Sequence, residues 1–239
     1  MERLQKVIAN LGYTSRRNAE QLIVDGKVKV NGEVVKELGT KVKMDDLIEV
    51  EGNVLDNSNK NYEYYLLYKP REVISSAKDE CGRKTVIDLI PTGTRIYPVG
   101  RLDYDTTGLI LLTNDGVLTN KLTHPSSMIE KKYVVKIAGL IHGNEVRKLC
   151  SGVIIDGKMT APARVKLKEI DKANNKSLLE VTIHEGRNHQ VRKMFEAVGY
   201  EVLKLKRERY AFLDLKGLKP GEYRKLSNKE VAILYSLVK

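Results

Sequence analysis

The stretch LQKVIANLGYTSRRNAEQLIVDGKVKVNGEVV, residues 4–35, decides the fold of the first part of this chain. Two short amphipathic helices are predicted, one over residues 2–11 and one from an N-cap at Thr14 or Ser15 to Gly26. The apolar side chains follow helical spacing and are Leu4, Val7, Ile8 and Leu11, then Ala19, Leu22 and Ile23. The chain therefore opens with two helices that meet at a tight turn.

A β-hairpin and a linker follow these helices. Asn31-Gly32 lies between two Val-rich runs and predicts a type I′ turn, because both residues tolerate its positive φ angles. A further strand is predicted over residues 47–50. Residues 52–61 contain four Asn, one Ser and one Gly, which predicts a linker. We therefore expect a small domain with its linker in residues 1–60 and a larger domain in residues 61–239.

The larger domain alternates short strands with few helices, which predicts an α+β fold with a mostly antiparallel sheet. Strands are predicted over residues 64–68, 96–99, 109–113, 132–137, 163–168, 178–183 and 201–205. Helices are predicted over residues 117–122, 144–149, 188–198 and 228–238. Ser227 followed three residues later by Glu230 predicts a capping box at the start of the last helix.

The amino-acid composition indicates which class of molecule the protein binds. The 239 residues include 42 Lys and Arg against 31 Asp and Glu, a net charge of +11, and 41% are hydrophobic. Residues 1–60 carry ten basic and ten acidic side chains, so the whole excess belongs to residues 61–239. Clustered cations favour a polyanion, and nucleic acid is the leading candidate ahead of an anionic membrane.

Cellular location and membrane insertion can also be read from the chain. The longest aliphatic run, Leu109–Leu112, is far short of the roughly 18 apolar residues that a membrane span requires. Met1-Glu2-Arg3 does not lead into an apolar signal segment, and Cys81 and Cys150 are too far apart to suggest a disulfide framework or a metal clip. We therefore expect a protein of the reducing cytoplasm.

Three stretches resemble ligand motifs but lack an essential residue. Residues 152–158 have the spacing of a phosphate-binding loop, yet Met159 stands where Ser or Thr is needed, so a strand and turn is favoured. Residues 103–114 begin like a calcium loop but end in Asn instead of Glu. His184 and His189 are five residues apart, off the spacing of a zinc helix. The sequence therefore predicts no metal and no cofactor.

Two other runs are unusually dense in polar side chains. GRLDYDTTGL, residues 100–109, lies between two predicted strands and reads either as an ordinary turn or as a loop that carries catalytic groups. EGRNHQVRKMF, residues 185–195, opens a helix with cations, where the helix dipole disfavours them. Arg16 and Arg17 repeat this feature in the second helix. Such cations indicate either a phosphate site or a solvated surface pair.

These stretches together carry a resemblance. Residues 2–50 resemble the small RNA-binding domain shared by a small-subunit ribosomal protein, some tRNA synthetases and several RNA-modifying enzymes. The runs GRLDYDTTGL and EGRNHQVRKM, with YYLLYKPREVISS (64–76) and KKYVVKI (131–137), resemble the motifs of RNA pseudouridine synthases of the RsuA/RluB branch. LKLKRERYAFLDLKGLKPGEYRKL (203–226) resembles the type that modifies large-subunit ribosomal RNA. His189 departs from the Arg that this branch leads us to expect.

The resemblance implies an enzyme that isomerises a uridine of ribosomal RNA to pseudouridine after flipping the nucleotide out of its helix. It implies Asp103 as the catalytic carboxylate and Arg192 as its ion-pair partner. It also implies Tyr133 as the ring that stacks on the target base, and Arg101 as the side chain that fills the gap left by the flipped nucleotide. The remaining RNA-binding residues would be Arg16, Arg17, Lys69, Arg187, Asn188, Gln190 and Lys193.

The implied partner is 23S ribosomal RNA or a large-subunit assembly intermediate, bound by a monomer without cofactor, metal or membrane. The alternative is a noncatalytic RNA-binding or ribosome-assembly factor on the same scaffold. Asp103 together with Arg192 favours the enzyme, because a protein that only binds RNA has no reason to place a carboxylate among phosphate-seeking cations.

Overall fold

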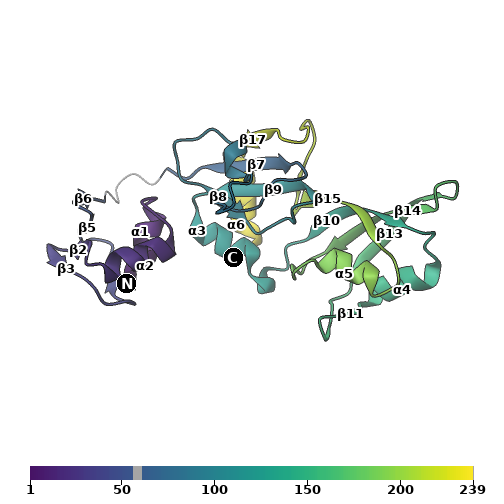
Figure 1. Cartoon of the computed structure of the whole chain (residues 1–239), viewed down its shortest axis with the longest axis horizontal. Helices are drawn as coiled ribbons and strands as arrows, with labels where there is room; N and C mark the ends of the chain where they lie inside the picture. The colour runs from purple at the N-terminus through teal and green to yellow at the C-terminus, as the bar shows by residue number, and fades with distance from the viewer. Residues whose placement is uncertain (56–60, 239) are drawn as a thin grey trace. The chain divides into compact units, whose positions relative to one another are not determined.

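The computed structural model describes residues 1–55 and 61–238, and the chain folds into two compact units (Figure 1). The first unit is Met1–Glu63 with Thr92–Ile96 and Asn114–Gly116, and the second contains the rest. Part of the predicted linker is regular structure, because Asn53–Val54 is a strand paired with its neighbour. The rest of the predicted linker falls mainly on residues 56–60, outside the described residues.

The first unit follows the predicted order of helices and hairpin. Its elements are β1 (Glu2–Arg3), α1 (Leu4–Asn10), α2 (Arg16–Val24), β2 (Val28–Val30), β3 (Glu33–Val34), β4 (Lys41–Val42), β5 (Ile48–Val50) and β6 (Asn53–Val54). Ser15 is the N-cap of α2, since its Oγ accepts from the Asn18 N–H at 3.1 Å. Asn31 and Gly32 both have positive φ, at 52° and 88°, which confirms the predicted hairpin turn.

One apolar core holds the first unit together. Strands β3, β2, β5 and β6 form one sheet in that order, and β1 pairs with β4. The buried side chains come from both helices and from the strands, and are Leu4, Ile8, Ala19, Ile23, Val28, Val42, Ile48 and Val50. The helical faces predicted from apolar spacing thus supply half of this core.

The second unit is built on one large sheet, with the order β13-β14-β10-β15-β9-β7-β17. The bounds are β7 (Tyr64–Lys69), β8 (Tyr97–Val99), β9 (Thr107–Thr113), β10 (Lys131–Ala138), β13 (Arg164–Asp171), β14 (Lys176–Ile183), β15 (Val202–Tyr210), β16 (Leu213–Asp214) and β17 (Tyr223–Lys225). Every pair is antiparallel except β9 with β15. The predicted α+β fold with a mostly antiparallel sheet is confirmed.

The helices of the second unit are α3 (Gly116–Thr123), α4 (Gly143–Ser151), α5 (Gln190–Glu196) and α6 (Asn228–Leu237), with short 3-10 turns η1 (Ile87–Leu89) and η2 (Pro125–Ser127). Leu118 of α3 and Leu234 of α6 pack with Leu66 and Leu109 of the sheet in one core. The predicted capping box at Ser227 and Glu230 is present. Among the described residues, no helix has the length and apolar content that a membrane span requires.

The stretch that resembles a phosphate-binding loop is a β-hairpin. Strand β11 (Ile154–Ile155) pairs with β12 (Lys158–Met159), and the turn residues Asp156 and Gly157 have positive φ angles of 50° and 75°. The interpretation as strand and turn is therefore confirmed, and the hairpin leaves Ile154 and Met159 exposed.

Candidate active site

The second unit contains a pocket of about 480 Å³ lined by four segments that are far apart in sequence. These segments are the loop between β8 and β9, the stretch from the end of α3 through η2 into the start of β10, the stretch from β14 into α5, and the end of β15. Among the residues expected at the site, those that line the pocket are Arg101, Asp103, Tyr133, Arg187 and Gln190. The fold thus brings both dense polar runs of the sequence to one place.

The loop that carries Asp103 is held from both sides. Leu102 is anchored to Ser75, whose hydroxyl accepts from the Leu102 N–H at 3.0 Å and donates to the Leu102 carbonyl at 2.8 Å. On the other side, the Thr106 N–H donates to the Asp103 carbonyl at 3.1 Å and closes a turn. The Asp103 side chain is 29% exposed, so it is fixed in position and still accessible from the pocket.

Lys69 is placed differently from the expected RNA contact, because its side chain is fully buried. Its Nζ donates to the carbonyl oxygens of Pro70, Tyr104 and Thr106 at 3.0, 3.4 and 2.8 Å. Burial lowers the pKa of Lys69 to about 8, although the carboxylate of Asp103 acts in the opposite direction. The ammonium therefore ties the end of β7 to the loop that carries Asp103 and has no surface to offer a phosphate.

Arg192 also differs from expectation, because its partner is Asp105 and not Asp103. Its Nη2 lies 2.7 Å from Asp105 Oδ2, while Nη1 donates to the Val202 carbonyl at 3.0 Å. The bond to the start of β15 directs the guanidinium toward the more exposed carboxylate. Asp103 Oδ1 instead lies 3.5 Å from His189 Nε2, so the residue that departs from the family pattern is the one that faces the expected catalytic aspartate.

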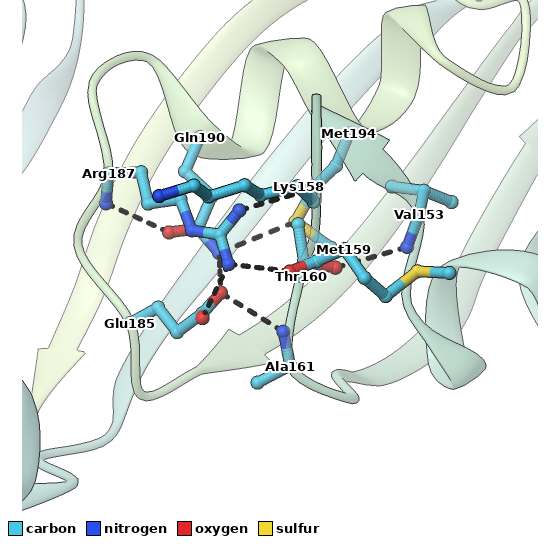
Figure 2. Close-up of polar contacts among 9 residues, drawn as sticks. All are labelled: Val153, Lys158, Met159, Thr160, Ala161, Glu185, Arg187, Gln190 and Met194. Carbon is cyan, nitrogen blue, oxygen red and sulfur yellow. Dashed lines mark hydrogen bonds and ion pairs between the residues drawn. The ribbon is translucent and has the colours of Figure 1, made fainter. Parts of the chain in front are cut away.

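The Arg187 side chain forms hydrogen bonds and an ion pair with other residues of the protein, as Figure 2 shows. Its Nη1 donates to the Lys158 carbonyl at 3.1 Å, and its Nη2 donates to the Met159 carbonyl at 2.6 Å and pairs with Glu185 Oε1 at 3.0 Å. The guanidinium thus fastens the β11–β12 hairpin to the segment before α5. This arrangement differs from the direct RNA contact expected for Arg187.

Glu185 and Gln190 complete the cluster in Figure 2. Glu185 Oε2 accepts from the Ala161 N–H at 3.1 Å and from Gln190 Nε2 at 2.7 Å, while Gln190 Oε1 accepts from the Arg187 N–H at 2.9 Å. Burial acts to raise the pKa of Glu185, but these donors and the Arg187 charge outweigh it, so the pKa is lowered. Gln190 is buried, and the cluster shapes the pocket wall.

The other expected site residues differ in where they lie. Arg101 is exposed and lines the pocket, whereas Asn188, between the lining residues Arg187 and His189, is exposed and does not line it. Lys193 pairs with Asp156 at 2.6 Å, at the tip of the β11–β12 hairpin. Arg16 and Arg17 lie in the first unit, exposed in the first turn of α2, with no side-chain hydrogen bond or ion pair to any residue the structure describes.

Three residues that sequence reasoning missed also line the pocket. Lys131 and Tyr210 lie on β10 and β15, and Arg207 precedes Tyr210 on β15. Burial, and then the charge of Arg207, lower the pKa of Lys131 to about 8. Period-two alternation could have found Arg207, because it shares a sheet face with the buried Leu205.

The pocket suits chemistry on a nucleic acid. A partly exposed carboxylate, Asp103, faces a space that is bordered by a buried aromatic ring, Tyr133, and by several basic side chains. Carboxylates act as nucleophiles and as bases, and the surrounding cations favour a polyanionic substrate. In the part of the chain that the structure describes, no cluster of three or more His, Cys, Asp or Glu could hold a metal ion.

Comparison with known families agrees with this site. The RNA pseudouridylate synthase model matches residues 63–197, and the S4 domain model matches residues 2–48. The chain therefore belongs to the RNA pseudouridylate synthase family, whose members are isomerases that act on RNA, and it carries an S4 domain at its N-terminal end.

Individual relatives extend the similarity to almost the whole chain. The chain is 56% identical to ribosomal large subunit pseudouridine synthase B of Bacillus subtilis, over 99% of this chain and 97% of the relative. It is 38% identical to an RNA pseudouridine synthase of Aquifex aeolicus, over 99% and 94%. A crystal structure of a pseudouridylate synthase matches with a TM-score of 0.69 at 33% identity, over 98% of this chain and 100% of the other.

Proposed function

We propose that this enzyme isomerises a specific uridine of large-subunit ribosomal RNA to pseudouridine. The observation that carries the proposal is the 56% identity, over almost the full length of both chains, to a relative named for the large ribosomal subunit. The pocket with Asp103 at its edge gives that activity a place in this chain. The substrate is the 23S RNA, either free or in an assembly intermediate of the large subunit.

The reaction breaks the bond between uracil N1 and ribose C1′ and joins C5 to C1′, with a proton lost from C5 and one gained at N1. Asp103 acts on the nucleotide as nucleophile or as base at the ribose. Tyr133 stacks on the base, and its almost complete burial gives that ring a fixed position. A pocket of this kind holds the detached uracil while it rotates and keeps water away from it.

The target uridine has to leave its stack before it reaches the pocket, at a cost of a few kcal/mol. Arg101, which is exposed and lines the pocket, fills the gap that the flipped nucleotide leaves. Asn188, which is exposed, and Lys193, which pairs with Asp156, contact the RNA backbone. Arg192 holds the acidic loop through Asp105, and Lys69, Arg187 and Gln190 position the pocket walls through the contacts described above.

The S4 domain supplies a second RNA contact. Arg16 and Arg17 are exposed at the start of α2, where free N–H groups and two guanidinium groups suit a phosphate. We divide the chain functionally into residues 1–60, which bind RNA, and residues 61–239, which catalyse. The enzyme acts as a monomer, and its proposed ribosomal substrate assigns it to the cytoplasm.

Mapping pseudouridines in ribosomal RNA from cells with and without the gene tests this function. We expect one or a few large-subunit positions to revert to uridine in the deletion strain, and to be restored by the gene on a plasmid. An unchanged large-subunit map, or a loss confined to small-subunit RNA or tRNA, would contradict the proposed substrate.

A further inference from the structure

Arg207 is a buried cation in the wall of the active-site pocket that the mechanism above does not use. The residue is 4% exposed and lies on β15. Its Nε donates to the Leu109 carbonyl at 2.7 Å, which fixes the guanidinium plane. Its Nη2 is buried and has no hydrogen-bond partner among the residues described. A buried donor that is left unpaired costs about 1–3 kcal/mol, and more when it carries charge.

The sheet places Arg207 between the two catalytic elements. Arg207 is in register with Tyr133 on the antiparallel neighbour β10 and with Gly108 on the parallel neighbour β9. Gly108 has a φ of +119°, and a Cβ there would lie 2.2 Å from the Arg207 carbonyl oxygen, so only glycine permits this approach. The position of Arg207 is thereby fixed relative to the loop that carries Asp103.

A second cation, the half-buried Lys131, lies beside Arg207. The Arg207 Cζ is 5.3 Å and the Lys131 Nζ is 5.9 Å from the centre of the Tyr210 ring. Lys131 Nζ donates to the His184 carbonyl at 2.7 Å. Within the described chain, neither cation has a carboxylate within 4.0 Å. The buried charge of Arg207 is therefore uncompensated, which costs several kcal/mol. An acceptor from outside the chain would satisfy both.

We propose that Arg207 Nη2 donates a hydrogen bond to a carbonyl oxygen of the target uracil, and that Arg207 and Lys131 together stabilise the base once it is detached. This inference rests on the proposed function. When the N1–C1′ bond breaks, its electron pair stays on the uracil, and the negative charge spreads to the two carbonyl oxygens. Fixed cations in a closed pocket stabilise such developing charge more than water does.

The same arrangement explains a preference for uracil. Both exocyclic groups of uracil are acceptors, whereas cytosine presents an amino donor in place of one carbonyl oxygen. A guanidinium has donors only and cannot accept from that amino group. When the electron pair of the anionic base forms the C5–C1′ bond, the base becomes neutral; the C5 proton then leaves and N1 takes one up. The hold on the neutral base is weaker, which favours release.

The test compares Arg207→Gln with Arg207→Lys and with the matched control Arg209→Gln, which changes an exposed arginine two residues further along β15. The substrate is a large-subunit RNA fragment that contains the mapped uridine. Removing one donor to a developing oxyanion lowers kcat by about 10²–10³-fold. We expect that loss for Arg207→Gln with KM within about threefold, partial recovery in Arg207→Lys, and no change in Arg209→Gln.

Fragments with 2-thiouridine or 4-thiouridine at the target position identify the contact, because sulfur is a weaker acceptor than oxygen. We expect one of the two to slow the wild-type enzyme about tenfold or more and to have no further effect on Arg207→Gln. If both thio substrates slow the two enzymes by equal factors, Arg207 does not touch the base. If Arg207→Gln does not fold, the rates of Arg207→Lys and of the wild-type enzyme on the two thio substrates are compared in the same way.

Two further results separate the inference from the proposed function. A rise in KM with kcat unchanged in Arg207→Gln would assign the cation to a backbone phosphate and overturn the inference. A wild-type enzyme that makes no pseudouridine in any large-subunit RNA would instead contradict the proposed function and leave no role for Arg207 in it.

Discussion

Replacing Lys69 with Met tests whether this buried ammonium holds the catalytic loop or contacts RNA. Met has a similar volume but cannot donate to the three carbonyl oxygens that Lys69 bonds. A pKa lowered from 10.5 to about 8 corresponds to a cost of roughly 3 kcal/mol for keeping the ammonium in the fold. Hydrogen bonds from an ion contribute about 1.5–3 kcal/mol each, so three of them outweigh that cost.

We therefore expect Lys69→Met to lower the free energy of unfolding by about 1.5 kcal/mol or more, measured in urea. The loop that carries Asp103 would relax, and a displacement of about 1 Å at a reacting group costs on the order of 10²-fold in kcat/KM. RNA affinity should stay within about threefold, because Lys69 is fully buried. Lys84→Met, at an exposed lysine of the same unit, is the control.

The opposite pattern in Lys69→Met would exclude a role of Lys69 in holding the loop that carries Asp103. A tenfold loss of RNA affinity, with stability and kcat as in the wild type, would make Lys69 an RNA contact after all. Filter binding with the same RNA fragment that is used for the rate measurement distinguishes the two outcomes.

Three other changes probe separate parts of the structure. Asp105→Asn breaks an ion pair with α5 but leaves Asp103 in place, so pseudouridine formation should fall about tenfold or less, and complete loss would mean that Asp105 is the essential carboxylate. The side chain of Arg224 lowers the pKa of Glu230 from 4.5 to about 2, so this carboxylate stabilises the fold above pH 4.5 and less as the pH falls toward 2. Glu230→Gln should lower the free energy of unfolding by about 1 kcal/mol at pH 7, after allowance for solvent screening, and by little near pH 2. Equal losses at both pH values, measured by urea unfolding, would show that the ionised carboxylate is not the source of this stability. Arg16 and Arg17 changed together to Ala should flatten the slope of log affinity against log salt by about one to two, and an unchanged slope would make them a solvated surface pair.

Local patterns predicted most of the fold. The type I′ turn at Asn31-Gly32 follows from the φ angles these two residues tolerate, and the capping box follows from Ser227 and Glu230 alone. The seven strands predicted for the larger domain are all present, and each is either an apolar run or an alternation of apolar and polar residues. Short strands whose pairing is long-range escaped prediction, such as Tyr223–Lys225 against β7, because three residues carry no periodicity of their own.

Parts of the site depend on contacts that no local pattern encodes. Lys69 is buried because carbonyl oxygens from a loop 35 and 37 residues later surround it. Arg192 pairs with Asp105 and not with Asp103 because its guanidinium also donates to the Val202 carbonyl, a bond that joins α5 to β15. Arg207 is different, because it shares a sheet face with the buried Leu205 along β15; the five charges among the eight residues of LKLKRERY make that strand look solvated.

Pseudouridine formation by Asp103→Asn tests most directly whether Asp103 performs the chemistry of an RNA pseudouridine synthase. Asn keeps the shape of the side chain but cannot act as an anionic nucleophile or base. We expect the rate on large-subunit RNA to fall by on the order of 10⁴-fold or more, about 5.4 kcal/mol of transition-state stabilisation, with RNA affinity unchanged or slightly higher. Pseudouridine formation by the Asp103→Asn enzyme at close to the wild-type rate would contradict this role.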